Sequence, residues 1–215
     1  KVLVTIRHSA PFGVGDAVPL MRSFFADANI DFSSIKALKF LDSIPVPLEK
    51  SIKGRIGDYY ALKSLIYDEF ENYSIAYQYN ILALKYAEKE KNYETAGEAS
   101  LELFKNIYFN KRDSTAFNYL EKARYFYKLS EYKYGKVEVD QMEAYVKLLN
   151  NEYEACNKVL LEQLDTYSDI KDDAYYYMFA LFMITSNYIH LEDLKKAQLY
   201  YNRFEKLENN STVIP

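Results

Sequence analysis

The sequence predicts an all-α protein built from antiparallel helix pairs, and three observations lead to this fold class. No proline lies between Glu49 and Ile214, so the residue that most strongly interrupts a helix is absent from most of the chain. After Gly57 the only glycines are Gly97 and Gly135, whereas a sheet protein would need many more turn residues. Apolar side chains recur with the 3.6-residue period of an α-helix.

This periodicity divides the chain into ten expected helices. The apolar residues from Ile75 to Tyr86 form one stripe of a helix, and Ser74 before them is a predicted N-cap. Similar stripes follow Asp113 and Asp193. The expected helices span residues 17–27, 33–44, 52–71, 74–90, 92–109, 114–128, 132–150, 153–168, 172–190 and 193–208.

Small residues repeat inside the second helix of each expected pair, at separations of 39, 40, 40 and 41 residues. They are Ala37, Ala76, Ala116, Cys156 and Ala197. A second series lies seven residues after the first and runs through Ile44, Ala83, Ala123, Gln163 and Phe204. Two helices and one short link per period of about 40 residues predict an array of helical hairpins.

Close contact between antiparallel helices explains why these residues are small. A side chain larger than Ala or Cys would push the two helix axes beyond their usual separation of roughly 8–10 Å. A tolerant partner is therefore expected on the preceding helix, twelve residues upstream. Ser64, Ala144 and Thr185 meet this expectation, whereas Phe104 stands at the equivalent position before Ala116.

These residues give the chain a resemblance to the tetratricopeptide repeat family. Numbered from Gly57, the first full repeat carries the family's small residues and tyrosines at Ser64, Tyr67, Tyr73, Ala76 and Ala83. Later repeats match in part, at Ala144, Tyr153, Leu160, Tyr188, Ala197 and Tyr201, with Cys156 in place of an alanine. The chain departs from the family in three ways: it lacks the tryptophan, it lacks the closing proline, and its period is about 40 residues instead of 34.

The resemblance covers roughly residues 33–207 and implies a right-handed α-α superhelix of about four to five repeats. It implies one helical domain over 17–208, preceded by a leader or arm over 1–16 and followed by a tail over 209–215. The long helices are similar to divergent repeats of bacterial sensor and regulatory proteins. HEAT repeats are the alternative architecture, disfavoured by the absence of internal prolines, and glycine-punctuated Sel1-like repeats fit less well.

In tetratricopeptide arrays the first helix of each repeat lines a concave groove, so the resemblance implies which residues face it. Position 2 carries Asp58, Glu98 and Glu138, three carboxylates one period apart. Positions 5 and 9 add Ala61, Leu65, Leu101, Lys105, Gln141, Tyr145, Phe182 and Ser186. Such a mixed apolar and acidic groove suits a peptide or helix of basic character. The alternative is that these acids only keep the helix starts soluble.

Candidate catalytic residues are few. The two histidines, His8 and His190, lie far apart in the sequence, and His190 is expected to contact the last carbonyls of its helix. Cys156 belongs to the small-residue series, so packing explains it better than nucleophilic chemistry does. The segment Gly13-Val-Gly15-Asp16 is too short for a phosphate-binding loop, and Asp172-Asp173 is expected to start a helix. We predict no catalytic residue, no metal site and no cofactor.

Charge and composition restrict the classes of partner. The formal net charge of −4 disfavours nucleic-acid binding, which needs a basic surface. A single cysteine excludes an intrachain disulfide. The longest apolar run, Ala174 to Ile184, is 11 residues and is shorter than the roughly 18–20 that a membrane span needs. The chain has 23 tyrosines, most of which we expect to pack between helices with a solvent-facing hydroxyl.

Together these features predict a noncatalytic scaffold that binds a protein, a peptide, a domain of the same polypeptide or a second copy of itself. The chain begins without methionine and ends abruptly at Pro215, so we expect it to be part of a larger bacterial protein. The resemblance favours an extracytoplasmic location over a cytoplasmic one. The alternative function is the ligand-sensing region of a signalling protein. The third is a hydrolase or transferase with a site in the leader or the groove, for which His190 and Cys156 are the most obvious residues.

Overall fold

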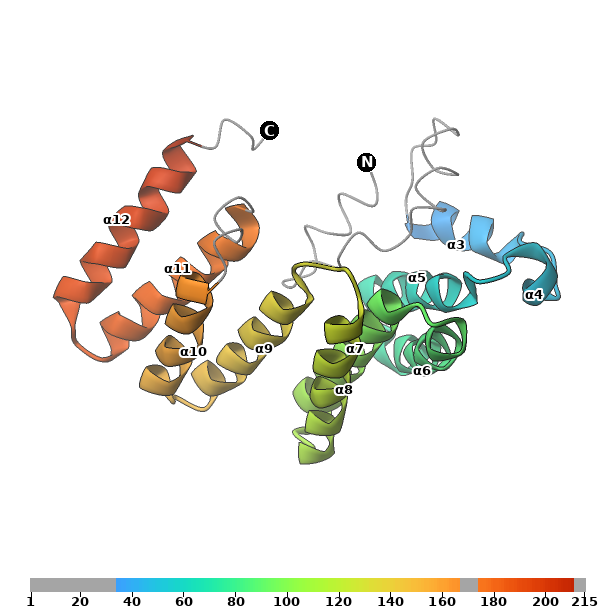
Figure 1. Ribbon diagram of the computed structural model, residues 1–215, viewed down its shortest axis with the longest axis horizontal. Helices are drawn as coiled ribbons and strands as arrows, with labels where there is room; N and C mark the ends of the chain where they lie inside the picture. The colour runs from blue at the N-terminus through green and yellow to red at the C-terminus, as the bar shows by residue number, and fades with distance from the viewer. Residues whose placement is uncertain (1–33, 167–173, 211–215) are drawn as a thin grey trace. The chain divides into compact units, whose positions relative to one another are not determined.

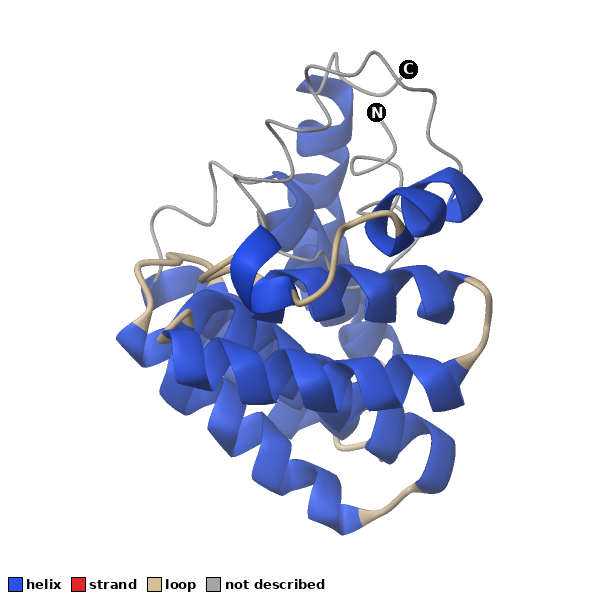
Figure 2. Ribbon diagram, turned by 90° about the vertical axis from the view of Figure 1, so that its right-hand side faces the viewer, coloured by secondary structure: helices blue, strands red, loops and turns tan. Residues whose placement is uncertain are grey.

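The computed structural model describes residues 34–166 and 174–210, and all regular structure in these two ranges is helical (Figure 2), which confirms the all-α class. A 3₁₀-helix, Ser114–Ala116, directly precedes α8. The α-helices labelled in Figure 1 are α3 Ser34–Asp42, α4 Leu48–Ser51, α5 Ile56–Glu69, α6 Tyr73–Glu90, α7 Tyr93–Lys111, α8 Phe117–Leu129, α9 Gly135–Leu149, α10 Tyr153–Thr166, α11 Ala174–His190 and α12 Leu194–Asn210. None of these helices has both the length and the apolar character needed to cross a membrane.

The chain divides into two compact units, and the boundary follows Gly135, the first residue of α9. The first unit holds α3 to α8, and the second holds the rest of α9 with α10, α11 and α12. Within each unit, helices that follow one another in the sequence pack together, as α5 does on α6, α7 on α8 and α11 on α12 (Figure 1). This sequential packing through short links is the contact pattern of helical hairpins.

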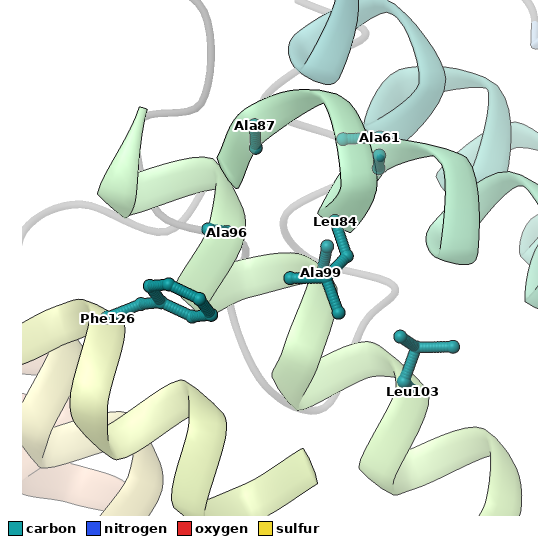
Figure 3. Packing of buried hydrophobic residues seen from close by; sticks show 8 residues of the cluster. Ala61, Leu84, Ala87, Ala96, Ala99, Leu103 and Phe126 are labelled. Atoms are coloured by element: carbon teal, nitrogen blue, oxygen red, sulfur yellow. The ribbon is translucent and has the colours of Figure 1, made fainter. Parts of the chain in front are cut away.

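Alanines dominate one core cluster of the first unit, to which α5, α6, α7 and α8 contribute (Figure 3), while a second cluster there buries larger side chains such as Leu41 and Ile66. The buried members of the alanine-rich cluster are Ala61, Ala83, Leu84, Ala87, Ala96, Ala99, Leu103 and Phe126. Small side chains let these helices approach closely, and half-buried tyrosines pack around them. The second unit buries larger aliphatic side chains, among them Met142, Leu160 and Ile184.

The structure buries the small residues of both periodic series. The exposed fraction is 6% or less for Ala37, Ala76, Ala83, Ala116, Ala123, Cys156 and Ala197. Ala76, Cys156 and Ala197 are each the fourth residue of their helix. At the first of these sites the hydroxyl of Ser64 donates a hydrogen bond of 2.9 Å to the carbonyl of Ala76, so the two helices touch where the small residue permits it.

A second close contact recurs one period apart along the chain. A Cβ atom added at Gly57 would lie 2.9 Å from the backbone of Ala87. One added at Gly97 would lie 2.7 Å from the ring of Tyr127, and Tyr127 also packs against Gly135. Both glycines lie near the start of a first helix, where the second helix that follows it leaves no room for a side chain.

Among the helix starts that differ from the prediction, two have a clear physical reason. Asn72 rather than Ser74 caps α6, because the Asn72 side chain accepts a hydrogen bond from the amide of Ile75. The helix predicted over 52–71 begins only at Ile56, since Gly54 adopts a left-handed φ of +76° between α4 and α5.

Tyrosine rings fill the contact between α5 and α6. The ring of Tyr60 lies 5.1 Å from that of Tyr59, 5.5 Å from Tyr86 and 6.0 Å from Tyr79. Tyr79 also stacks on Tyr67 at 5.5 Å. All of them except the buried Tyr59 are half-buried, which matches the expected interhelical role of these residues.

Several predicted features lie outside the described residues. They are the leader over 1–16 with His8, the helix over 17–27, the Asp172-Asp173 pair, and residues 211–215 of the tail.

Candidate functional site

The structure divides the eleven residues predicted to line a groove by their burial. Six are 8% exposed or less: Asp58, Ala61, Glu98, Leu101, Glu138 and Gln141. Four are half-buried: Leu65, Lys105, Tyr145 and Ser186. Phe182 alone is widely exposed, at 62%. The three periodic carboxylates are therefore interior groups, which differs from the expectation that they face a groove.

Asp58 shows why a carboxylate at this position is buried. Its Oδ1 accepts hydrogen bonds from Asn92 Nδ2 at 2.7 Å and from the Thr95 hydroxyl at 2.5 Å. Its Oδ2 accepts one from Arg55 at 2.9 Å. Asn92 and Thr95 belong to the start of α7, so Asp58 ties the start of one first helix to the start of the next.

Glu90, the last residue of α6, binds the start of α5, the end at which Asp58 lies. Its carboxylate accepts hydrogen bonds of 3.0 Å from the backbone amides of both Ile56 and Gly57. Amides in the first turn of a helix lack intrahelical partners, and the helix dipole favours a negative charge there. Burial raises the pKa of nearby Glu94, and the Asp58 carboxylate raises it further.

In the second unit, Glu138 and Gln141 also make interior hydrogen bonds. Glu138 accepts a hydrogen bond of 2.5 Å from the Tyr176 hydroxyl. Gln141 Nε2 donates to the carbonyl of Tyr176 at 2.9 Å and to Gln163 Oε1 at 3.1 Å. Gln163 Nε2 in turn donates to the carbonyl of Val137 at 2.9 Å. These bonds link α9 to α10 and α11, so Gln163 replaces the small residue of its series with a polar link.

In the first unit, the structure brings the half-buried Lys105 together with two carboxylates. Lys105 pairs with Glu102 at 2.5 Å. Burial raises the pKa of Asp68 on α5, Glu102 raises it further, and Lys105 opposes both effects. The carboxylates beside Lys105 are therefore Asp68 and Glu102, whereas Asp58 and Glu98 are buried.

An apolar stripe lies exposed along α11. Tyr175, Phe182 and Ile189 follow at seven-residue spacing and expose 38%, 62% and 55% of their surface. The half-buried residues on the same face are Met178, Phe179, Thr185 and Ser186. Since the opposite face of α11 is also apolar and buried, this helix is more hydrophobic than the core alone requires. We call this set the α11 stripe.

A pocket of about 560 Å³ lies in the second unit, between one face of α10, the end of α11 and the start of α12. Its lining residues are Glu154, Asn157, Lys158, Leu161, Glu162, Asp165, Tyr188, Leu191, Asp193 and Lys196. Asn157 is the only one of them that is buried, at 4% exposure, so it forms the floor. None of the predicted groove residues lines this pocket, which lies mainly on second helices.

The walls of the pocket carry more negative than positive charge. Lys158 pairs with Glu162 at 4.0 Å, and Lys196 pairs with Asp193 at 2.9 Å. Hydrogen bonds from the side chain and backbone amide of Lys196 lower the pKa of Asp193. The Lys196 ammonium also lies 5.0 Å from the centre of the Tyr188 ring.

The two side chains considered for catalysis both lie in packing contacts. Burial raises the pKa of the Cys156 thiol, which disfavours the nucleophilic thiolate. His190 stacks on Tyr153, with ring centres 4.7 Å apart and planes at 1°, in place of the expected contact with helix carbonyls. Across 34–166 and 174–210, no three His, Cys, Asp or Glu side chains are grouped so that they could hold a metal ion.

No family model, curated protein or solved structure matches this chain.

The pocket was not predicted, because the resemblance implies a groove formed by first helices, whereas the pocket lies mainly on second helices. A signal was nevertheless present on the second helix α10. Glu154, Asn157, Leu161 and Asp165 recur at helical spacing and place carboxylates at both ends of one face. Asp193 was noted only as a helix start, and its hydrogen bond to the Lys196 amide fits that role.

Proposed function

We propose that this chain is a noncatalytic protein-interaction module, a tetratricopeptide-like array in which first helices present side chains to a partner protein. The observation that carries the proposal is the α11 stripe. Monomeric proteins rarely expose contiguous apolar patches larger than about a few hundred Å², and larger patches mark interaction sites. Phe182, at the centre of the stripe, is a rigid aromatic side chain of the kind enriched at interfaces.

The right-handed superhelix of four to five repeats belongs to the same proposal. Its support is the period of about 40 residues, together with the sequential packing of helices within each unit. The recurring contacts of Gly57 and Gly97 add to this support, because each meets a residue thirty positions later.

Site-specific photocrosslinking in cells tests the proposal. One variant carries p-benzoylphenylalanine in place of Phe182, and the control carries it in place of Tyr125, a 59% exposed residue of α8. We expect a crosslinked protein from position 182 only. Adding Ile189→Asp should reduce that yield by at least about five-fold, because a charge on the stripe opposes apolar docking. Equal yields from the two positions, or a yield that Ile189→Asp leaves unchanged, would contradict the proposal.

A further inference from the structure

The pocket between α10 and α12 combines two unpaired negative charges with an unpartnered hydrogen-bond donor. The lysines of the pocket are already paired with Glu162 and Asp193. Glu154 and Asp165 have no cationic partner among the described residues, and both are exposed. The charge of this pocket therefore favours a ligand that carries positive charge.

Asn157 adds a second requirement for the ligand, which is a hydrogen-bond acceptor. Its Oδ1 accepts a hydrogen bond of 2.9 Å from Asn187 Nδ2. Within the part of the chain that the structure describes, Asn157 Nδ2 and Asn187 Oδ1 are both buried and have no hydrogen-bond partner. Buried amide hydrogens are nearly always bonded, so Asn157 Nδ2 points to a group that completes the site. The missing partner is an acceptor such as a carbonyl oxygen.

The positions of these groups define the shape of the ligand. Glu154 and Asp165 lie eleven residues apart on one face of α10, which is about 16 Å along the helix axis. Asn157 lies between them, one turn from Glu154. An extended peptide with basic residues four positions apart spans about 13 Å, and flexible side chains cover the remainder. Leu161 and Leu191 offer apolar surface to the stems of those side chains.

We propose that this pocket binds an extended basic peptide segment. Its two cationic side chains pair with Glu154 and Asp165, and one of its backbone carbonyls accepts a hydrogen bond from Asn157. A simple polyamine fits less well, because its protonated nitrogens offer no acceptor to Asn157. This site is independent of the α11 stripe and of the function proposed for it.

Binding of short peptides to the full chain tests the proposal. The probe is acetyl-Arg-Ala-Ser-Ala-Arg-amide, and the control is the same peptide with glutamate in place of both arginines. Titration followed by protein NMR should give a Kd below about 1 mM for the arginine peptide only, weakening with added salt. Shifts should centre on α10 and the start of α12. Equal affinity for both peptides, or shifts centred elsewhere, overturns the proposal.

Variants separate the pocket from the overall charge of the chain. Glu154→Gln with Asp165→Asn should weaken binding by at least about five-fold and leave the fold intact, because both side chains are exposed. Glu49→Gln with Glu88→Gln removes the same charge from exposed residues outside the pocket and should change the Kd by less than about two-fold. Equal effects of the two double variants would overturn the proposal.

Two further measurements test the acceptor and the independence of the site. Asn157→Ala should weaken binding of the arginine peptide about three- to ten-fold while leaving spermidine binding unchanged. Tighter binding of spermidine than of the peptide overturns the assignment of Asn157. Phe182→Ser should leave peptide binding unchanged, so failure of the pocket and failure of the α11 stripe give different results.

Discussion

Buried and half-buried carboxylates hold helix ends of the first unit in place, and Asp58 accepts three side-chain hydrogen bonds of this kind. Asp58→Ala removes three hydrogen bonds and leaves Asn92 and Thr95 without their acceptor. We expect the free energy of unfolding to fall by about 2–4 kcal/mol. Urea denaturation measures it, with the exposed Glu88→Ala as control, which should change stability by less than about 0.5 kcal/mol.

The same variant has a second, electrostatic readout. Burial and then the Asp58 carboxylate raise the pKa of Glu94. Removing the Asp58 charge should therefore move the pKa of Glu94 down towards its ordinary value of 4.5, which carboxyl NMR can follow. An unchanged stability together with an unchanged pKa of Glu94 would contradict the interior, hydrogen-bonded role of Asp58.

Lys63 is a buried cation in the same unit, 8% exposed, and its Nζ donates to Asp42 Oδ1 at 2.5 Å. Burial alone would lower the pKa of Lys63, but hydrogen bonds to Asp42 and Tyr59 raise it above its ordinary value of 10.5. Asp42→Asn leaves the buried ammonium without its anion and should lower the free energy of unfolding by about 1–2 kcal/mol. This is less than for a fully buried pair, because Asp42 is 55% exposed.

The comparison variant Lys63→Met removes the charge and keeps the apolar stem, so it should cost less than Asp42→Asn. Because the pKa of Lys63 is raised, the lysine stays charged below pH 10.5, and its contribution is lost only as the pH rises through the higher folded value. Asp42→Asn should therefore lose more stability than Lys63→Met at both pH 7 and pH 9. A larger loss for Lys63→Met in urea denaturation would contradict this account.

The burial and contacts of a single residue can be predicted only when its partners lie close to it in the sequence. The period of Asp58, Glu98 and Glu138 is visible in the sequence. Their burial is not, because the partners of Asp58 in α7 lie more than thirty residues later. The interior polar links of Gln163 and the pairing of Asn157 with Asn187 depend on such distant contacts too.

Helix contacts are set by glycines at the start of α5 and α7. A methyl group at Gly57 meets the backbone of Ala87, which cannot move aside, whereas one at Gly97 meets the side chain of Tyr127. Each single Gly→Ala substitution should lower stability by about 1–3 kcal/mol through overpacking. The two positions should differ in whether a second substitution relieves the strain.

A pair of double-mutant cycles measures this difference. Tyr127→Ala removes the ring that Gly97→Ala would strike, so Gly97→Ala should cost about 1 kcal/mol less, or nothing, in that background. Ala87→Gly removes only the Cβ contact, and the Cα and N atoms of residue 87 still block a methyl group at Gly57. Equal coupling in the two cycles would contradict the different contacts assigned to the two glycines.

At the scale of elements, periodicity predicted most of the helices, because apolar spacing and the lack of proline act locally. The helix over 74–90 and α6 differ by one residue. The start of α5 was missed, since it depends on the left-handed Gly54 and on amides bonded to the distant Glu90. The spacing of residues on α10 indicates only one wall of the pocket, because three helices supply its walls.

At the scale of the molecule, packing between sequence neighbours should confine a local loss of stability to its own region. Asp58→Ala should speed amide hydrogen exchange in α5, α6 and α7 more than in α11 and α12. Cys156 gives a second probe, because its buried thiol reacts with a thiol reagent only after the second unit opens. Its labelling rate should change by less than about three-fold in Asp58→Ala.

The reciprocal variant completes this test. Met183 lies in α11 and is 1% exposed, so its replacement by alanine should lower the free energy of unfolding by about 2–5 kcal/mol. Met183→Ala should speed exchange in α11 and α12 and accelerate labelling of Cys156, while α5 and α6 keep most of their protection. Each unit then opens on its own, as expected for an array whose stability is a sum over neighbouring hairpins. Equal acceleration throughout the chain in both variants would instead identify a single cooperative unit, because a fully coupled fold transmits every local loss to all of its amides.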